Sequence, residues 1–392
     1  MKKIVVVGSG FGGLSIASKL KAKKFDVTLI EKHKDLGGRA RTFVHNDFKY
    51  DAGPTVITAP YLIDELFSAH GEKLSDYVNL LPVKPWYRFL FDSGDYIDYG
   101  DKLISTVHEI KAKYGNDKAQ AYLKLLKHSK QIFKKGFIEL SDEPFESIFS
   151  MLKHLPALIK IRFDRSVYQT VNKYLNNKNL NEALSMHPLL VGGNPYSTTS
   201  IYLLIQYLEW KWGVYYAEGG TGRIIDGLEK LLIKKDVNIK KNTEAKKIIL
   251  KNNKVVGIDT SQGIIDCDIV VCNSDPTYTY NNLLGFKPKK ASNRFNLKHS
   301  MSLFVLYFST TKIYKDVKHH TIIFSKRHYE LLNDIFNKKV FVSDPSLYLH
   351  RPGATDPSMI QNGNDTFYVL APVPNNLSKI DWNDKGNELA NI

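Results

Sequence analysis

The chain has 392 residues, enough for two domains, and its 43% hydrophobic and 24% charged residues are typical of a folded globular protein. The net charge of +15 leaves three explanations open: nucleic-acid binding, attraction to an anionic membrane surface, or a solvated lysine-rich face. Without a helix-turn-helix, zinc-finger or aromatic RNA-binding signature, we expect no nucleic-acid partner. The lysine-dense run at 232–254 alternates with aliphatic residues, which locally favours a solvated face. No uncharged apolar stretch reaches about 18 residues, so no transmembrane helix is predicted.

The first predicted elements are a strand at 2–8, a glycine turn and a helix. The Val/Ile run in the strand is typical of a parallel strand buried on both faces, and the turn has the spacing G-x-G-x-x-G. The glycines allow a tight turn, close approach of a pyrophosphate and packing of the helix, whose N-terminus offers free N–H groups. A plain tight turn is the alternative. The motif predicts dinucleotide binding by Gly8, Gly10, Phe11, Gly12 and Gly13.

A second strand at 25–32 ends with Glu31 and Lys32. An acid at this position accepts hydrogen bonds from a ribose hydroxyl and repels a 2′-phosphate, which predicts FAD or NAD and excludes NADP. The alternative is that Glu31 is a surface glutamate beside Lys32. We include both Glu31 and Lys32 among the predicted cofactor contacts.

The next segment distinguishes FAD from NAD. Gly37 and Gly38, followed at once by Arg39, resemble the extended signature of the flavin amine oxidase and carotenoid desaturase superfamily. There the arginine lies near the FAD phosphates, where a fixed cation offsets their charge; a solvated arginine is the alternative. The stretch at 48–60 closely resembles the carotenoid desaturases, with Gly53 and Pro54 in a rigid turn along the flavin and Thr55 as a polar contact. Further matches run through the chain, and nearly all of it resembles the bacterial phytoene desaturases.

Later elements follow in order. Residues from about 100 to 190 are predicted to be helical. The segment at 219–232 resembles one that precedes strands covering the adenine, which places Ala245, Lys246, Asn273 and Asp275 close to FAD, to within a residue or two. Short strands are predicted from 237 to 275, as hairpins feeding a final buried strand into the nucleotide-binding sheet, and strands of a second sheet after 300.

The resemblance implies an α/β fold: a discontinuous Rossmann-like FAD-binding domain, a second α+β substrate domain, and an inserted helical lobe that contacts the membrane. We expect the FAD-binding domain at 1–85 and 215–285, and the substrate domain at 86–214 and 286–392. The implied activity is FAD-dependent desaturation of phytoene and partially desaturated carotenes by hydride transfer to flavin. The implied location is cytoplasmic, on the anionic inner face of the membrane. Another superfamily member, such as an amine oxidase or carotenoid isomerase, and an inactive fragment are the alternatives.

No catalytic residue and no metal site are predicted, because no Ser-His-Asp set, metal-ligand spacing or acid/base pair is evident. Some relatives carry an acid and an arginine where Ser150 and Lys153 stand here. The family also ends in a strand and a second glycine-rich segment at the flavin, which we do not find after Asp275. We expect a truncated or frameshifted reading, a separate chain that supplies this segment, or a protein that works without it, in that order.

Overall fold

The computed structural model describes residues 1–140, 148–285 and 299–392. The chain forms two compact units, Met1–Leu81 with Tyr215–Lys298, and Pro82–Val214 with His299–Ile392. The chain passes from the first unit to the second between Leu81 and Pro82, a few residues before the predicted boundary at 85. The Val83 N–H donates to the Val214 carbonyl, and both residues belong to the second unit. The second predicted boundary, 285/286, adjoins residues outside the described ranges. The roles assigned to the two domains stay predictions.

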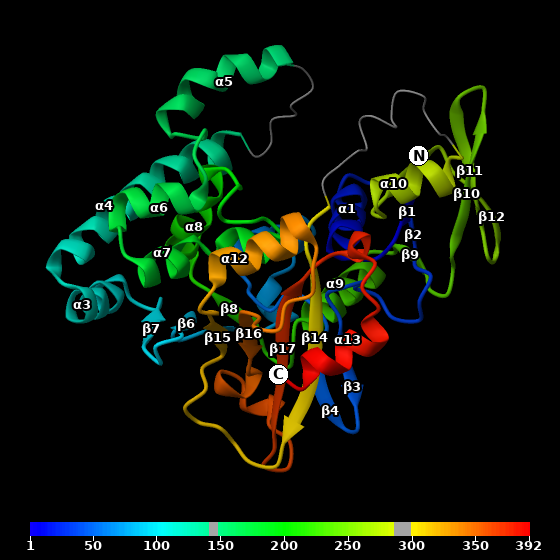
Figure 1. Cartoon of the computed structure of the whole chain (residues 1–392). Helices are drawn as coiled ribbons and strands as arrows, with labels where there is room; N and C mark the ends of the chain where they lie inside the picture. Colours follow the sequence, from blue (N-terminus) through cyan, green and yellow to red (C-terminus); the bar gives the residue numbers. More distant parts are fainter. Residues whose placement is uncertain (141–147, 286–298) are drawn as a thin grey trace. The chain divides into compact units, whose positions relative to one another are not determined.

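The first unit contains a four-stranded parallel sheet with the order β13-β1-β2-β9. Figure 1 labels three of these strands, β1, β2 and β9. Its helices and strands are β1 (Lys3–Val7), α1 (Phe11–Ala22), β2 (Asp26–Ile30), β3 (Thr42–His45), β4 (Phe48–Asp51), α2 (Tyr61–Ser68), β5 (Leu80–Pro82), β8 (Tyr215–Ala217), α9 (Gly222–Lys234), β9 (Asn238–Lys240), β10 (Ala245–Lys251), β11 (Lys254–Thr260), β12 (Gly263–Asp266), β13 (Ile269–Cys272) and α10 (Pro276–Tyr278).

Both faces of β1 are covered, as its aliphatic run predicts. Val6 belongs to one hydrophobic cluster with Leu14 of α1 and Leu228 of α9. Val5 and Val7 belong to another, with Ile248 and Ile258 of the antiparallel sheet β10-β11-β12. Successive side chains of a strand point to opposite faces, so one short strand contributes to two cores.

The hairpins predicted between 237 and 275 are confirmed as β10-β11 and β11-β12, while the first run forms β9, which pairs in parallel with β2. One detail of these strands was wrong. The last run, β13, pairs with β1 as predicted, but it is an edge strand and its residues are half-buried or exposed. An edge strand has a neighbour on one side only, which leaves part of its surface uncovered.

The second unit contains a six-stranded sheet with the order β14-β17-β16-β15-β6-β7, antiparallel except where β15 meets β6. Among the described residues, its α-helices and strands are β6 (Tyr87–Leu90), β7 (Tyr96–Tyr99), α3 (Leu103–Tyr114), α4 (Asn116–Phe133), α5 (Ile148–Lys160), α6 (Val167–Leu175), α7 (Lys178–Ser185), α8 (Leu204–Trp212), β14 (Ser302–Thr310), β15 (His320–Ile323), α12 (His328–Asn333), β16 (Leu347–His350), β17 (Asp365–Val373) and α13 (Trp382–Ala390).

The predicted helical region at 100–190 corresponds to α3 through α7. Serine and glutamine make a capping box at the start of α6, where Ser166 accepts from the Gln169 N–H and the Gln169 side chain accepts from the Ser166 N–H. Among the described helices, none combines the length and the apolar character needed to cross a bilayer.

Candidate dinucleotide site

A cavity of about 800 Å³ opens in the first unit at the carboxyl ends of β1 and β2. Ligands of parallel α/β sheets bind at this end of the strands, and the volume lies within the range of cofactor pockets. The lining residues come from the β1–α1 turn, the end of β2 and the loop after it, the start of β10 and the segment after β13. They include Val7, Gly8, Ser9, Gly10, Phe11, Ile30, Glu31, Lys32, His33, Gly37, Gly38, Arg39, Ala40, Arg41, Pro54, Thr243, Glu244, Ala245, Asn273, Ser274, Asp275, Tyr278 and Leu283.

The glycine turn holds the start of α1 at the cavity. Gly8 has a φ of +90°, and a Cβ on Gly13 would lie 1.9 Å from the Gly8 carbonyl oxygen. The N-cap, Gly10, has no side chain that could accept from the first N–H groups, and no acidic residue lies in the first turn. The positive end of the α1 dipole is therefore open to an anion such as a phosphate.

The segment after β13 packs directly against this turn. The Asn273 N–H donates to the Val7 carbonyl at 2.9 Å. A Cβ on Gly12 would lie 2.5 Å from Asn273 Oδ1, and one on Gly10 would lie 3.0 Å from Asn273 Nδ2. Gly12 therefore gives Asn273 room at the turn.

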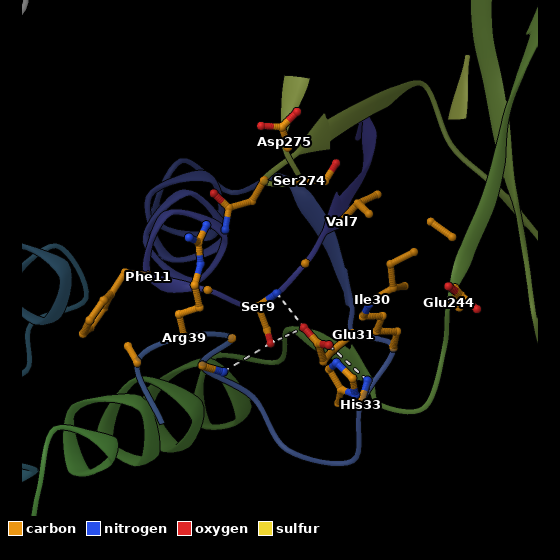
Figure 2. A pocket seen from close by; sticks show the side chains of 18 of the residues that line it. Val7, Ser9, Phe11, Ile30, Glu31, His33, Arg39, Glu244, Ser274 and Asp275 are labelled. Atoms are coloured by element: carbon orange, nitrogen blue, oxygen red, sulfur yellow. Dashed lines mark hydrogen bonds between the residues drawn. The ribbon is translucent and has the colours of Figure 1, made fainter. Parts of the chain in front are cut away.

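Glu31 is held by three donors at the end of β2. Its Oε2 accepts from the Ser9 hydroxyl at 2.6 Å and the Ser9 N–H at 3.0 Å, and its Oε1 accepts from the His33 N–H at 3.0 Å. Figure 2 shows Ser9 and Glu31 facing each other across these bonds. Burial alone would raise the pKa of the Glu31 carboxyl, but these hydrogen bonds outweigh burial and the pKa lies below its ordinary value. Glu31 is thus a fixed carboxylate at the cavity wall.

The loop after β2 carries the predicted arginine. The Gly37 N–H donates to the Ser9 carbonyl at 3.0 Å, and a Cβ on Gly37 would lie 2.9 Å from the Ile225 side chain. Arg39 is exposed and lines the cavity beside this loop. A Cβ on Gly53 would lie 1.7 Å from the Arg39 carbonyl oxygen, so only a residue without a side chain fits beside the loop at this position.

A second glycine-rich helix start, at α9, has a different role. The Thr221 N–H donates to Asp51 Oδ1 at 2.7 Å, and the Gly222 N–H donates to Thr42 Oγ1 at 3.0 Å. The Thr221 hydroxyl donates to the Pro54 carbonyl at 2.8 Å. Protein side chains thus satisfy N–H groups here, and the α9 start braces the Pro54 turn.

Most of the predicted cofactor residues meet at one cavity. Gly8, Gly10, Phe11, Glu31, Lys32, Gly38, Arg39, Pro54, Ala245, Asn273 and Asp275 all line it. Gly12, Gly13, Gly53, Thr55 and Lys246 are not among the lining residues. Lys246 is exposed on β10 next to Ala245, and neighbouring strand side chains point in opposite directions. Thr55 is buried.

Sequence reasoning missed several lining residues. Thr243 and Glu244 adjoin the predicted Ala245, and the Thr243 N–H donates to the Glu31 carbonyl at 2.7 Å. Ser9, the small polar residue between the first two glycines, orients Glu31. Its hydroxyl was the available signal, because a serine at this position can reach the end of the neighbouring strand.

These features fit an FAD molecule. The open α1 start and Arg39 suit its pyrophosphate, and the fixed carboxylate of Glu31 suits a ribose hydroxyl. A smaller apolar hollow of about 290 Å³ shares Phe11 and Pro54 with the cavity and adds Val56, Ile57, Leu62, Leu66, Ile224 and Leu228.

Residues 11–335 match the family model of the flavin containing amine oxidoreductases. The chain is 40% identical to the lycopene-forming phytoene desaturase of Pseudescherichia vulneris over 394 aligned residues, 99% of this chain and 80% of that protein. It is 36% identical to the neurosporene-forming phytoene desaturase of Rhodobacter capsulatus, over 96% of this chain and 73% of that protein.

A solved structure shares the fold. The oxidoreductase from Methanosarcina mazei superposes with a TM-score of 0.65 at 15% identity, covering 99% of this chain and 82% of that one. At this identity the likeness concerns the fold alone.

Proposed function

Because the chain belongs to the flavin containing amine oxidoreductases and, within them, to the bacterial phytoene desaturases, we propose that it is an FAD-dependent desaturase of phytoene. It introduces conjugated double bonds into phytoene, toward neurosporene or lycopene. The observation that supports this proposal most strongly is the sequence identity of 36–40% to desaturases with these products, over nearly the whole chain.

The residues of the first unit bind and orient the cofactor. Glu31 accepts from the ribose hydroxyls of the adenosine half, while the α1 start and Arg39 balance the charge of the pyrophosphate. FAD, when bound, supplies the hydride acceptor for C–H oxidation of a hydrocarbon. We assign no catalytic side chain. Ser150 and Lys153 lie in α5, but their side chains are outside the described part of the chain.

A split enzyme is a second candidate. The apolar hollow beside Phe11 and Pro54 gives another polypeptide a surface to cover. We propose that a separate polypeptide with a glycine-rich segment completes the flavin side of the site. Such a partner would raise FAD affinity and activity when added in trans.

A membrane surface is the proposed place of action, on the cytoplasmic inner face. Large apolar side chains are exposed in the second unit, including Ile104 on α3 and Val191 after α7, at 73% and 59% exposure. Isolated exposed apolar residues are ordinary, but a water-insoluble substrate and a charge of +15 favour an anionic bilayer. Co-sedimentation with anionic and neutral vesicles tests this, and Ile104→Glu should weaken binding while the control Ile233→Glu, in the first unit, leaves it unchanged.

The decisive experiment is conversion of phytoene by the purified full chain. Phytoene in anionic vesicles is incubated with FAD and an electron acceptor, with and without the polypeptide proposed to complete the site, and the products are separated by chromatography. Neurosporene or lycopene from the chain alone supports the desaturase, and product only with the added polypeptide supports the split enzyme.

A matched pair of variants ties the activity to the described site. Glu31→Gln should lower FAD affinity and turnover, whereas Glu65→Gln, an exposed glutamate on α2, should change neither. Conversion of an amine or isomerisation of a carotenoid, with phytoene unchanged, would contradict the proposal and favour another superfamily activity.

A further inference from the structure

Three buried histidines meet in the six-stranded sheet of the second unit. His320 begins β15 and His350 ends β16, and the two are partners in the antiparallel pairing of these strands. His319 directly precedes β15. One ring nitrogen from each histidine lies within 4.8 Å of the others, and all three side chains are at most 2% exposed. Buried imidazoles that converge from two strands form a set of nitrogen donors on a rigid support.

Hydroxyl groups orient two of the rings. His320 Nδ1 lies 2.6 Å from the Tyr348 hydroxyl oxygen, and His319 Nδ1 lies 2.7 Å from Thr355 Oγ1. If each Nδ1–H donates to its hydroxyl oxygen, each Nε2 presents a lone pair. Metal-binding histidines usually have such a partner at the second nitrogen, which sets the tautomer.

His320 Nε2 is the atom whose surroundings indicate a ligand. It is buried and has no hydrogen-bond partner among the described residues. With the other tautomer, the same atom would instead be a buried N–H without an acceptor. Either state leaves a buried polar atom unsatisfied, which is unfavourable, and coordination of a cation by the Nε2 lone pair removes this penalty.

The charges near the cluster also permit a cation. Burial, together with neighbouring charges that include the other imidazoles, lowers the pKa of His319 and His320 well below 6.5, and neutral imidazole is the form that binds metals. The nearby Arg351 is compensated by Asp365, with 2.6 Å between Arg351 Nε and Asp365 Oδ2. An incoming cation therefore meets three imidazole nitrogens and an arginine whose charge is already compensated.

We propose that His319, His320 and His350 bind one divalent cation of the zinc class. Tetrahedral zinc with Zn–N bonds of about 2.0–2.1 Å places its ligand nitrogens roughly 3.3 Å apart, so the rings must close by up to about 1.5 Å. Small side-chain rotations supply this movement. The fourth position is left to water. The ion would link β15 to β16 and stabilise the second unit, independently of the dinucleotide site.

Cobalt titration of the untagged full chain tests this proposal. After removal of metals with a chelator, Co²⁺ is added and the visible absorption of tetrahedral Co²⁺ is followed, with Zn²⁺ as competitor. We expect one equivalent per chain. His320→Gln and His350→Gln should abolish the signal, and Tyr348→Phe, which removes the partner of His320 Nδ1, should weaken binding roughly 10- to 100-fold. His328→Gln is the matched control, because His328 is buried in the same unit outside the cluster.

The proposal fails if the wild-type chain takes up no stoichiometric tetrahedral Co²⁺, or if His320→Gln binds it as tightly as the wild type. Circular dichroism establishes whether each variant folds. Should the variants not fold, the wild type decides: Zn²⁺ must raise its unfolding midpoint by an amount that grows with the logarithm of the concentration. An unchanged midpoint would overturn the proposal.

Discussion

Acid should destabilise the second unit through His328, which begins α12. Its ring packs edge-on against Phe324, and Nδ1 lies 3.0 Å from the Ser346 hydroxyl oxygen. Burial, with a smaller contribution from Lys178, lowers the pKa of His328 from 6.5 to about 4. Because the folded state disfavours the charged ring, this histidine contributes its full stability above pH 6.5 and loses it as the pH falls from 6.5 toward 4.

The size of the effect follows from this shift. Between about pH 7.5 and about pH 4.5, linkage gives a loss of roughly 2.5 kcal/mol from His328 alone. Other groups titrate over the same range, so the quantity to measure is a difference: the loss of unfolding free energy in the wild type minus that in His328→Gln. Glutamine keeps a polar group near Ser346 and removes the titration. His108→Gln, an exposed histidine of the same unit, is the control.

Tryptophan fluorescence reports on the unit concerned. All four tryptophans of the chain, Trp86, Trp210, Trp212 and Trp382, belong to the second unit. Urea unfolding at both pH values, with a chelator present, gives the four free energies. If wild type and His328→Gln lose the same stability within about 0.5 kcal/mol, the neutral buried histidine does not contribute as described.

Three further predictions follow from single contacts. Glu31→Gln should weaken FAD binding roughly 10- to 100-fold in a fluorescence titration, because a charge-assisted hydrogen bond is lost; unchanged affinity would contradict the ribose role. Gly13→Ala should lower the thermal midpoint measured by circular dichroism and abolish FAD retention, since the new methyl group would lie 1.9 Å from the Gly8 carbonyl oxygen. Asp365→Asn should lower the free energy of unfolding, measured by tryptophan fluorescence, by about 3–5 kcal/mol, because it leaves the buried Arg351 without its counter-charge. A loss of unfolding free energy under about 1 kcal/mol would show that the pair is solvated.

The nucleotide half of the candidate site could be read from about forty contiguous residues. The Val/Ile run, the glycine spacing and the placement of Glu31 specify a strand, a turn, a helix and a second strand. These elements are contiguous in the sequence, so their packing does not depend on distant segments. Gly12 and Gly13 were predicted for the same reason, but the side chains that pack against these glycines were not. That Gly12 makes room for Asn273 depends on β13 lying beside β1, far away in the sequence.

The remaining features depend on pairing between distant segments. Thr243 and Asn273 reach the cavity because β9 and β13 flank β2 and β1. Asn273 was predicted from the family resemblance, whereas no local pattern states which strand becomes whose neighbour, and Thr243 was missed. A shift of one residue would turn every side chain of a strand to its other face. The same holds for the histidine cluster: thirty residues separate His320 from His350, and only the register of β15 on β16 places them opposite each other. Sequence alone therefore determined the dinucleotide motif, which is local, whereas tertiary structure decided which distant side chains share a site, because strand register is set by burial across the whole sheet.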